Sequence, residues 1–252
     1  MNQPLIVSFG GGVNSTAMLV EFVRRGVAID AILFADTGGE RPETYEHVWR
    51  FAAWLVEQGA PPVHIVHKGG RVETLEQNCL REKMLPSLAY GKAGCSHKYK
   101  IEPQERWANR RYRAHWKSGG RVTKALGFGA EEQRRANKGR NDDPKYDYWY
   151  PLIEWDMDRD ACLESIRAAG APLPGKSACF FCPGSHDPEI RRLRDQYPDL
   201  FARALEMERN AKPNLLWTRG LGRKFAWADI DYQERHQLTL DLPCGCYDGE
   251  PA

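Results

Sequence analysis

Hydrophobic residues along the chain form short runs that alternate with longer segments of helical periodicity. Five runs predict buried strands, over residues 4–9, 30–36, 63–68, 121–129 and 148–155. Between these runs, apolar residues at helical spacing predict helices over residues 15–26, 43–59, 72–85 and 158–170, three of which end at a glycine. Strands that alternate with helices favour an α/β fold built on a doubly wound, mainly parallel, Rossmann-type sheet.

The pattern changes after Pro183, where a charged helix over residues 189–209 precedes an irregular tail. We therefore expect an α/β domain over residues 1–184 and a small, cysteine-containing C-terminal extension over residues 185–252. A length of 252 residues with 42% hydrophobic content is enough to bury a substantial core. No apolar run approaches the roughly 18–20 residues of a membrane span. Because no signal peptide precedes the first strand either, we expect a cytoplasmic protein without a membrane partner.

The first strand candidate runs directly into three glycines in the stretch LIVSFGGGVNSTAML, and a predicted helix follows. Glycines let backbone N–H groups approach an anion closely, and the helix N-terminus adds its positive end. The same residues also fit an ordinary turn that leaves the strand, with Asn14 or Ser15 as the N-cap of the helix. The loop is not a Walker motif, because the Gly-Lys-Ser/Thr ending is missing. A net charge of +2 indicates no general affinity for polyanions, so any basic surface must be local.

Seven cysteines in a chain of this size, without a secretion signal, argue against a disulfide scaffold. Cys179 and Cys182 form a CxxC motif, and Cys244 and Cys246 form a second close pair. The CxxC spacing alone leaves zinc, an iron–sulfur cluster and a redox dithiol open. Two further cysteines, Cys79 and Cys162, lie at helical spacing among apolar residues and are expected in the core.

Four stretches, in order, resemble the adenine nucleotide alpha hydrolases and PAPS reductases, also known as PP-loop ATP pyrophosphatases. FGGGVNS is similar to the pyrophosphate loop of that superfamily, and FADTGGERPETYEHV is similar to its segment after the second strand. CSHKYKIEP resembles its Cys-Cys-x-x-Arg-Lys-Val-x-Pro segment. GFGAEEQRR, followed by YPLIEWDMDRDACLESIRAAGAPLP, resembles the last of its motifs. The resemblance covers roughly residues 4–184 and implies the nucleotide-binding fold of these enzymes.

The resemblance also implies a set of site residues. Catalytic roles would fall to Ser15, Asp36 and Arg135, with Asp36 near the phosphates or a magnesium ion. ATP would be held by residues of the strand ends and loops: Ser8, Gly10, Gly11, Gly12, Asn14, Ser15, Thr16, Phe34, Asp36, Thr37, Gly129 and Glu132. Taken without the resemblance, Asp36 could equally be a turn carboxylate, and Glu131, Glu132 and Arg135 could belong to a solvated loop.

Three positions depart from the superfamily pattern. Gly10 replaces a serine, Asn14 replaces an aspartate, and Phe128 replaces an arginine. The amide of Asn14 keeps hydrogen-bonding ability but carries no charge, which argues against a direct metal role. Arg134 or Arg135 would have to supply the missing cation.

In the iron–sulfur branch of these reductases, a Cys-Cys pair and a CxxC motif supply the cluster ligands. Here Cys95 matches the first cysteine of the pair, and Ser96 replaces the second. The resemblance thus implies a [4Fe-4S] cluster on Cys95, Cys179, Cys182 and Cys244 or Cys246. Thiolates also suit tetrahedral zinc, which remains the alternative.

The stretch over residues 98–121, from Lys98 to Arg121, combines many cations with Trp107, Tyr112 and Trp116. Positive charge follows phosphates, and aromatic rings stack on unpaired bases, so this stretch is a candidate nucleic-acid surface. The alternative is a helix that buries its tryptophans and leaves its arginines in water.

These observations leave three functions in competition. The favoured one is an enzyme that cleaves ATP between the α and β phosphates, adenylates an acceptor in nucleic acid, and prepares it for sulfur from a donor such as a cysteine desulfurase. The second is an adenylyl or phosphoadenylyl sulfate reductase that releases sulfite, although the PCGC tail lacks the flanking glutamate and histidine of that branch. The third is a metal-bearing nucleic-acid-binding module without catalysis.

Overall fold

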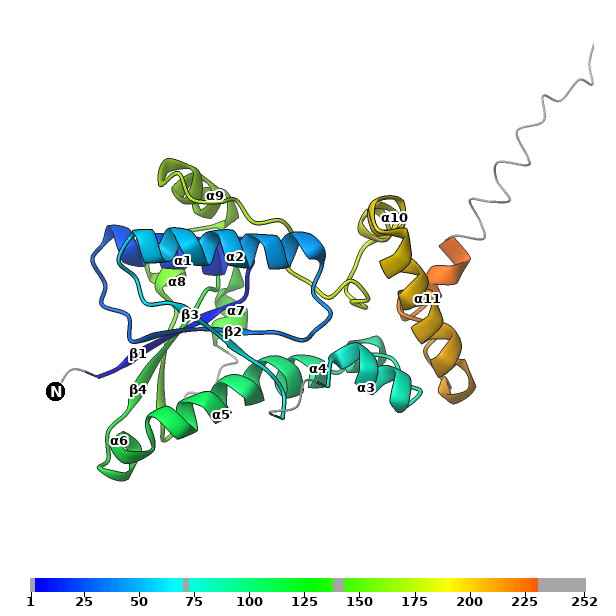
Figure 1. The fold of residues 1–252 in the computed structure, drawn as a ribbon, viewed down its shortest axis with the longest axis horizontal. Coiled ribbons are helices and arrows are strands. Elements are labelled where there is room, and N and C mark those ends of the chain that lie inside the picture. The colour runs from blue at the N-terminus through cyan, green and yellow to red at the C-terminus, as the bar shows by residue number, and fades with distance from the viewer. Residues whose placement is uncertain (1–2, 70–72, 138–142, 231–252) are drawn as a thin grey trace, which may run out of the picture. The chain divides into compact units, whose positions relative to one another are not determined.

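The fold was obtained as a computed structural model, which describes residues 3–69, 73–137 and 143–230. Its centre is a five-stranded sheet, formed by β1 (Leu5–Phe9), β2 (Ala31–Ala35), β3 (Val63–Val66), β4 (Val122–Leu126) and β5 (Tyr146–Trp149). The strand order is β3-β2-β1-β4-β5, and each neighbouring pair is parallel (Figure 1). The predicted α/β fold with a doubly wound parallel sheet is confirmed.

Helices cover both faces of the sheet because the strands are apolar on both faces. Val7 and Phe9 of β1 belong to a core with α1 (Val13–Arg24), α2 (Pro42–Glu57) and α9 (Arg159–Ala168), which lie on one face (Figure 1). Ile6, between them in the sequence, belongs to a second core on the opposite face, together with residues of α5 (Glu102–Arg111). The side chains of a strand alternate between faces, so one strand contributes to both cores.

The remaining helices of unit 1 are short: α4 (Gly94–Ser96), α6 (Arg113–Lys117), α7 (Gln133–Ala136) and α8 (Pro151–Glu154). A π-helical turn over His97–Ile101 leads into α5. The predicted helix over residues 72–85 is shorter in the structure, where α3 spans Leu75–Arg81. Within the described residues, every helix is too short or too polar to cross a bilayer. Cys79 and Cys162 are buried, as predicted.

Two predicted elements were wrong, and proline is the reason in both. The strand expected over residues 148–155 ends at Trp149, and Pro151 begins the helix α8. Proline has no N–H for a sheet ladder but fits the first turn of a helix. The single helix expected over residues 189–209 is two helices, α10 (Asp187–Gln196) and α11 (Pro198–Ala211), since Pro198 ends the first and begins the second.

The chain forms two compact units. Unit 1 contains residues 1–78 and 93–180, including the whole sheet, and unit 2 contains residues 79–92 and 181–252. The division expected from the sequence, after residue 184, did not include the segment 79–92 in the second unit.

Candidate functional site

A cavity of about 1110 Å³ lies in unit 1 where the strand order reverses, between the carboxyl ends of β1 and β4. In doubly wound sheets this is the position at which ligands bind. We call it the switch-point cavity. Seven of the predicted site residues line it: Ser8, Gly10, Gly12, Asn14, Ser15, Glu132 and Arg135.

The N-terminus of α1 lies at the wall of the switch-point cavity. Gly12 is its N-cap residue, no side chain caps it, and its first turn contains no acidic residue. Ser15 organises the loop, because its Oγ accepts from Gly10 N at 3.1 Å and donates to the Gly12 carbonyl at 3.1 Å. A helix N-terminus of this kind offers backbone donors and a partial positive charge to an anion.

Two glycines permit close approaches around this loop. Gly11 has a φ of +71°, and a Cβ there would lie 3.2 Å from Val48 and 3.3 Å from Thr44. A Cβ on Gly127, directly after β4, would lie 2.9 Å from the backbone nitrogen of Ser15. The end of β4 therefore packs directly against the first turn of α1.

A chain of contacts joins the glycine loop to the turn after β4. Asn14 Nδ2 donates to Glu132 Oε2 at 3.1 Å, and Glu132 Oε1 pairs with Arg135 at 2.8 Å. The guanidinium of Arg135 lies 4.4 Å from the centre of the Phe128 ring, which stacks on Tyr150. Arg135 thus lies beside the residue that replaces the arginine of the superfamily pattern.

Cations outnumber carboxylates along the wall of the switch-point cavity. The cationic residues are Lys100, Lys124, Arg135, Arg159 and Lys176, and the acidic ones are Glu105, Glu131 and Glu132. Gln104 is buried, and its Oε1 has no hydrogen-bond partner among the described residues. The Oδ1 atom of Asn14 is also buried and has no hydrogen-bond partner among the described residues. A basic wall with buried polar groups suits a ligand that carries phosphates and hydrogen-bonding groups.

The other predicted site residues do not line this cavity: Gly11, Thr16, Phe34, Asp36, Thr37 and Gly129. Phe34 is buried and packs against Phe9, with ring centroids 6.1 Å apart. Thr16 is buried and shares a hydrogen bond of 3.0 Å with His47 Nε2. Burial lowers the pKa of His47 to about 4, so its imidazole is neutral near pH 7.

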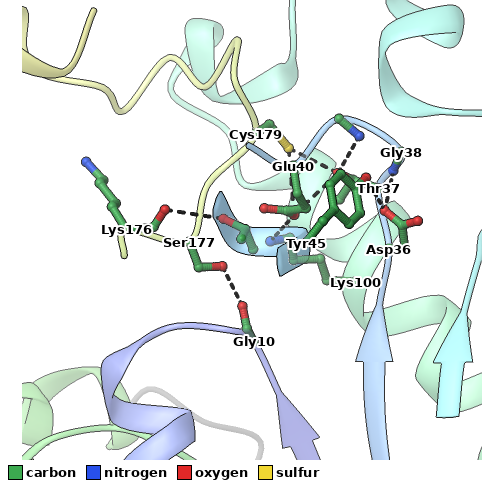
Figure 2. A network of polar contacts seen from close by, with 12 residues as sticks. Gly10, Asp36, Thr37, Gly38, Glu40, Tyr45, Lys100, Lys176, Ser177 and Cys179 are labelled. Carbon is green, nitrogen blue, oxygen red and sulfur yellow. Dashed lines mark hydrogen bonds and ion pairs between the residues drawn. The ribbon is translucent and has the colours of Figure 1, made fainter. Parts of the chain in front are cut away.

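Asp36 follows β2 and is held within the turn after it. Its Oδ1 accepts from Gly38 N at 2.7 Å and from the Tyr45 hydroxyl at 2.7 Å (Figure 2). Its Oδ2 lies 3.9 Å from His67 Nδ1. Burial, followed by the hydrogen bond to Asp36, raises the pKa of Tyr45, so this hydroxyl stays a donor. The carboxylate of Asp36 thus shapes the turn.

Figure 2 shows a second network around the same turn, centred on Glu40. Lys100 Nζ lies 2.9 Å from Glu40 Oε1, and the Glu40 side chain is fully buried. Cys179 Sγ lies 3.2 Å from Thr37 Oγ1 and 4.0 Å from Glu40 Oε1. Cys179 and Glu40 form an antiparallel bridge, which fixes the segment before Phe181 against the end of β2.

The cysteines are only partly described. Cys95 and Cys179 lie in unit 1, Cys182 lies in unit 2, and Cys244 and Cys246 fall outside the described residues. In the part of the chain that the structure describes, no group of three or more His, Cys, Asp or Glu side chains could hold a metal ion. The predicted ligand set therefore stays a prediction.

Sequence reasoning missed several residues of the cavity wall, among them Gln104, Lys124, Lys176 and Ser177. Ser177 Oγ donates to the Gly10 carbonyl, which joins the segment before the CxxC motif to the glycine loop (Figure 2). One available signal was Lys124, a charged residue in the middle of a predicted buried strand. A buried lysine in a strand is rare enough to indicate a site.

The basic stretch over residues 98–121 forms α5 and α6 and buries part of its aromatic side chains. Tyr112 lies in the core on the α5 face of the sheet, and Trp107 and Trp116 pack against that core.

A groove of about 890 Å³ is lined by residues of these two helices and by Lys145. Its lining combines cations with two glutamates and one tryptophan: Arg106, Arg110, Arg113, Lys117, Lys145, Glu102, Glu105 and Trp116, together with Asn109. We call it the α5–α6 groove. The five cations of the groove could contact a phosphate backbone, whereas its one aromatic residue, Trp116, is partly buried and offers little surface for a base to stack on.

Comparisons with known proteins find similarity to solved structures. No family model matches the chain, and no curated protein matches it. Among solved structures, phosphoadenylyl-sulfate (PAPS) reductase from Candida auris, in complex with phosphate, is 18% identical with a TM-score of 0.47 and covers 69% of this chain and 76% of its own. U34-tRNA thiolase NcsA from Methanococcus maripaludis, with its [4Fe-4S] cluster, is 14% identical with a TM-score of 0.44 and covers 86% of this chain and 74% of its own.

At these identities and TM-scores, neither structure assigns an activity to this chain. The chain is similar to these two solved structures in part of its fold.

Proposed function

We propose that this chain is an enzyme that binds ATP in the switch-point cavity and cleaves it between the α and β phosphates, adenylating an acceptor for sulfur transfer. The observation that carries the proposal is the N-terminus of α1. It is uncapped by any side chain, has no acid in its first turn, and lies at the wall of a cavity with five cationic residues. Such an arrangement favours a polyphosphate over a neutral ligand.

In the proposed reaction, an oxygen of the acceptor attacks the α phosphate, and the bond to the β phosphate breaks. Pyrophosphate leaves, and its charge is stabilised by backbone N–H groups at the uncapped N-terminus of α1, in the loop that Ser15 holds in place. Arg135 and Lys176 supply positive charge along the same wall. A sulfur nucleophile from a separate donor, such as a cysteine desulfurase, then displaces AMP, and the acceptor oxygen leaves with it.

Two groups that the resemblance implies would support this chemistry. Mg²⁺ would spread the phosphate charge, and it commonly reaches such sites with the nucleotide and keeps several waters. A [4Fe-4S] cluster, or zinc, would be held by Cys95, Cys179, Cys182 and one of Cys244 and Cys246. Cys179 lies next to the turn after β2, which supports a place for its thiol near the nucleotide site.

The α5–α6 groove supports nucleic acid as the carrier of the acceptor. Its five cations lie on the exposed side of α5 and α6 and beside β5, whereas Trp116 is partly buried. The glutamate Glu105 lines both the groove and the switch-point cavity. A strand bound along the groove would therefore lead toward the site of adenylation.

Product analysis tests the proposal. Incubation of the anaerobically purified protein with ATP and Mg²⁺, with and without RNA or DNA, should give AMP and pyrophosphate. Ser15→Ala should lower this rate by about 10-fold or more, because it removes the hydroxyl that organises the loop. The matched control is Ser118→Ala. It removes a hydroxyl that donates to the His115 carbonyl and does not line the switch-point cavity. Formation of ADP and phosphate, or an unchanged rate in Ser15→Ala, would overturn the assignment.

The two alternatives give different results in the same assays. A sulfonucleotide reductase would release sulfite from adenylyl sulfate or phosphoadenylyl sulfate with a thiol partner, and would not require ATP. A non-catalytic module would bind nucleic acid and show neither activity. Iron, sulfide and zinc analysis with a visible spectrum would distinguish the cluster from zinc.

A further inference from the structure

Unit 2 exposes two large apolar side chains at one point of its surface. In the loop over residues 212–224, which follows α11, Leu216 is 87% exposed and Trp217 is 95% exposed. The other tryptophan of unit 2, Trp227, is completely buried and stacks on Phe201. Burial of a tryptophan side chain stabilises a fold strongly. A tryptophan that is held in an exposed position, next to an exposed leucine, therefore indicates a binding surface.

The same loop is strongly basic. Lys212, Arg219, Arg223 and Lys224 lie within it, and it contains no acidic residue. All four side chains are exposed, and none forms an ion pair with any residue that the structure describes. Cations that no described residue neutralises are available to an anionic partner.

The loop is anchored on both sides, so the exposure of Trp217 does not result from a frayed end. The buried carboxylate of Glu208 accepts from three backbone N–H groups: Leu221 at 2.6 Å, Trp227 at 2.9 Å and Ala228 at 3.2 Å. A Cβ on Gly220 would lie 2.3 Å from that carboxylate, so only glycine fits there. On the other side, Asn214 Nδ2 donates to the Lys83 carbonyl at 3.0 Å, and Thr218 Oγ1 donates to the Ala89 carbonyl at 3.3 Å.

We propose that this loop is a binding site for unpaired nucleotides of a nucleic-acid strand. Trp217 would stack on one base, and Arg219, Arg223 and Lys224 would contact the neighbouring phosphates. A flat aromatic ring on a fixed backbone, in a loop that also exposes four cations, suits the binding of a single strand. A lipid surface fits less well, because it needs a broad apolar face. In this loop the large apolar side chains that are exposed are Leu216 and Trp217, and the polar Thr218 follows them.

The inference goes beyond the proposed function and does not rest on it. The loop lies entirely in unit 2, and binding of a strand there would persist whether or not ATP is cleaved in unit 1. It also differs from the α5–α6 groove, which offers cations but no fully exposed aromatic ring.

The test is a binding titration of the full chain, without ATP, against a labelled single-stranded oligonucleotide of RNA or of DNA. Trp217→Ala should weaken binding by about 5- to 150-fold, which corresponds to the loss of one stacked base. Trp217→Phe should retain most of the affinity. The double variant Arg219→Gln, Arg223→Gln should reduce the slope of log affinity against log salt by roughly 1.5, from two lost phosphate contacts.

A matched control comes from the same residue type in unit 1. Trp49 in α2 is 61% exposed, and Trp49→Ala should bind as the wild type does. The proposal is overturned if the wild type does not bind the oligonucleotide, or if Trp217→Ala and Trp49→Ala bind equally well. It is also overturned if Trp217→Ala loses binding to vesicles of anionic phospholipid while its affinity for the oligonucleotide is unchanged.

Discussion

The amide of Asn14 donates a hydrogen bond of 3.1 Å to the carboxylate of Glu132, across 118 positions of sequence. Asn14 lies in the first turn of α1, and Glu132 lies in the turn after β4, so the contact joins the two loops of the switch-point cavity. An amide therefore suits position 14, where the superfamily pattern that the sequence resembles has an aspartate. A second carboxylate at position 14 would face that of Glu132.

The first prediction follows from this contact. Asn14→Asp replaces a favourable bond with two facing carboxylates and should lower the free energy of unfolding at neutral pH by about 1–3 kcal/mol. Repulsion raises a carboxyl pKa in the folded state, so the loss should shrink as the pH falls toward the ordinary carboxyl range. Urea unfolding at neutral and mildly acidic pH measures both effects. The double variant Asn14→Asp, Glu132→Gln should regain most of the stability, and a double variant as unstable as the single one would contradict the explanation.

A second prediction concerns Gly127. Because a Cβ there would lie 2.8 Å from Ser15 Cα, Gly127→Ala must displace backbone and should cost about 1–3 kcal/mol of stability. Gly10→Ala is the control, since its Cβ would meet only Ser15 Oγ at 3.7 Å. Thermal unfolding of the two variants should therefore separate them, and equal melting temperatures would show that the packing of β4 against α1 is looser than described.

The sheet could be predicted from the sequence because its signals are local. Runs of apolar residues gave four strands to within three residues at each end, and glycine stops gave the ends of the long helices. The errors at Pro151 and Pro198 are also local, because in both the effect of the proline on the backbone was given too little weight. The short helices were not foreseen, since a segment of three to five residues has no periodicity to detect.

The site was only partly predictable, for a physical reason. The glycine loop has a sequence signature, and Gly10 and Gly12 of this loop line the cavity. Gln104, Lys124 and Ser177 reach the same cavity from α5, from β4 and from the segment before the CxxC motif. No local pattern brings these residues together, because the fold alone determines which of them meet. Asp36 illustrates the reverse case, since its motif is intact while its Oδ1 is occupied by Gly38 and Tyr45.

The third prediction tests the ion pair between the partly exposed Lys100 and the buried Glu40. Lys100→Met leaves the fully buried carboxylate of Glu40 without its cation and should destabilise unit 1 by about 3 kcal/mol. The double variant Lys100→Met, Glu40→Gln should be more stable than Lys100→Met, because no uncompensated charge remains. Denaturant titrations of the wild type, of Lys100→Met, of Glu40→Gln and of the double variant complete a double-mutant cycle, which gives the coupling energy. A coupling near zero would mean that the contact of 2.9 Å contributes nothing.

A fourth prediction concerns the pH dependence of stability. The pKa of His47 is lowered to about 4 by burial, whereas the unfolded chain has the ordinary value of 6.5. Between these values the unfolded state binds a proton that the folded state does not, so stability should fall as the pH falls from 6.5 to 4. The loss from this one residue should be on the order of 3 kcal/mol. In His47→Phe the slope of stability against pH in this window should be smaller by about one proton. An unchanged slope would show that His47 is protonated in the folded state.

The last prediction separates stability from function at one position. Gly12 is the N-cap of α1, has an extended backbone with φ of −106°, and a Cβ there would meet only Ser177 Cβ at 3.5 Å. Aspartate is among the best N-cap residues and favours the positive end of a helix, so Gly12→Asp should leave the melting temperature unchanged or raise it slightly. The same carboxylate would occupy the position proposed for phosphate and repel it. Binding of a fluorescent ATP analogue should therefore weaken by at least about 10-fold, corresponding to 1.4 kcal/mol.

The control is Gly12→Asn, which caps the helix without a charge. It should fold equally well and lose less affinity for the nucleotide. If Gly12→Asp binds the nucleotide as tightly as Gly12→Asn does, the phosphates do not lie at the N-terminus of α1.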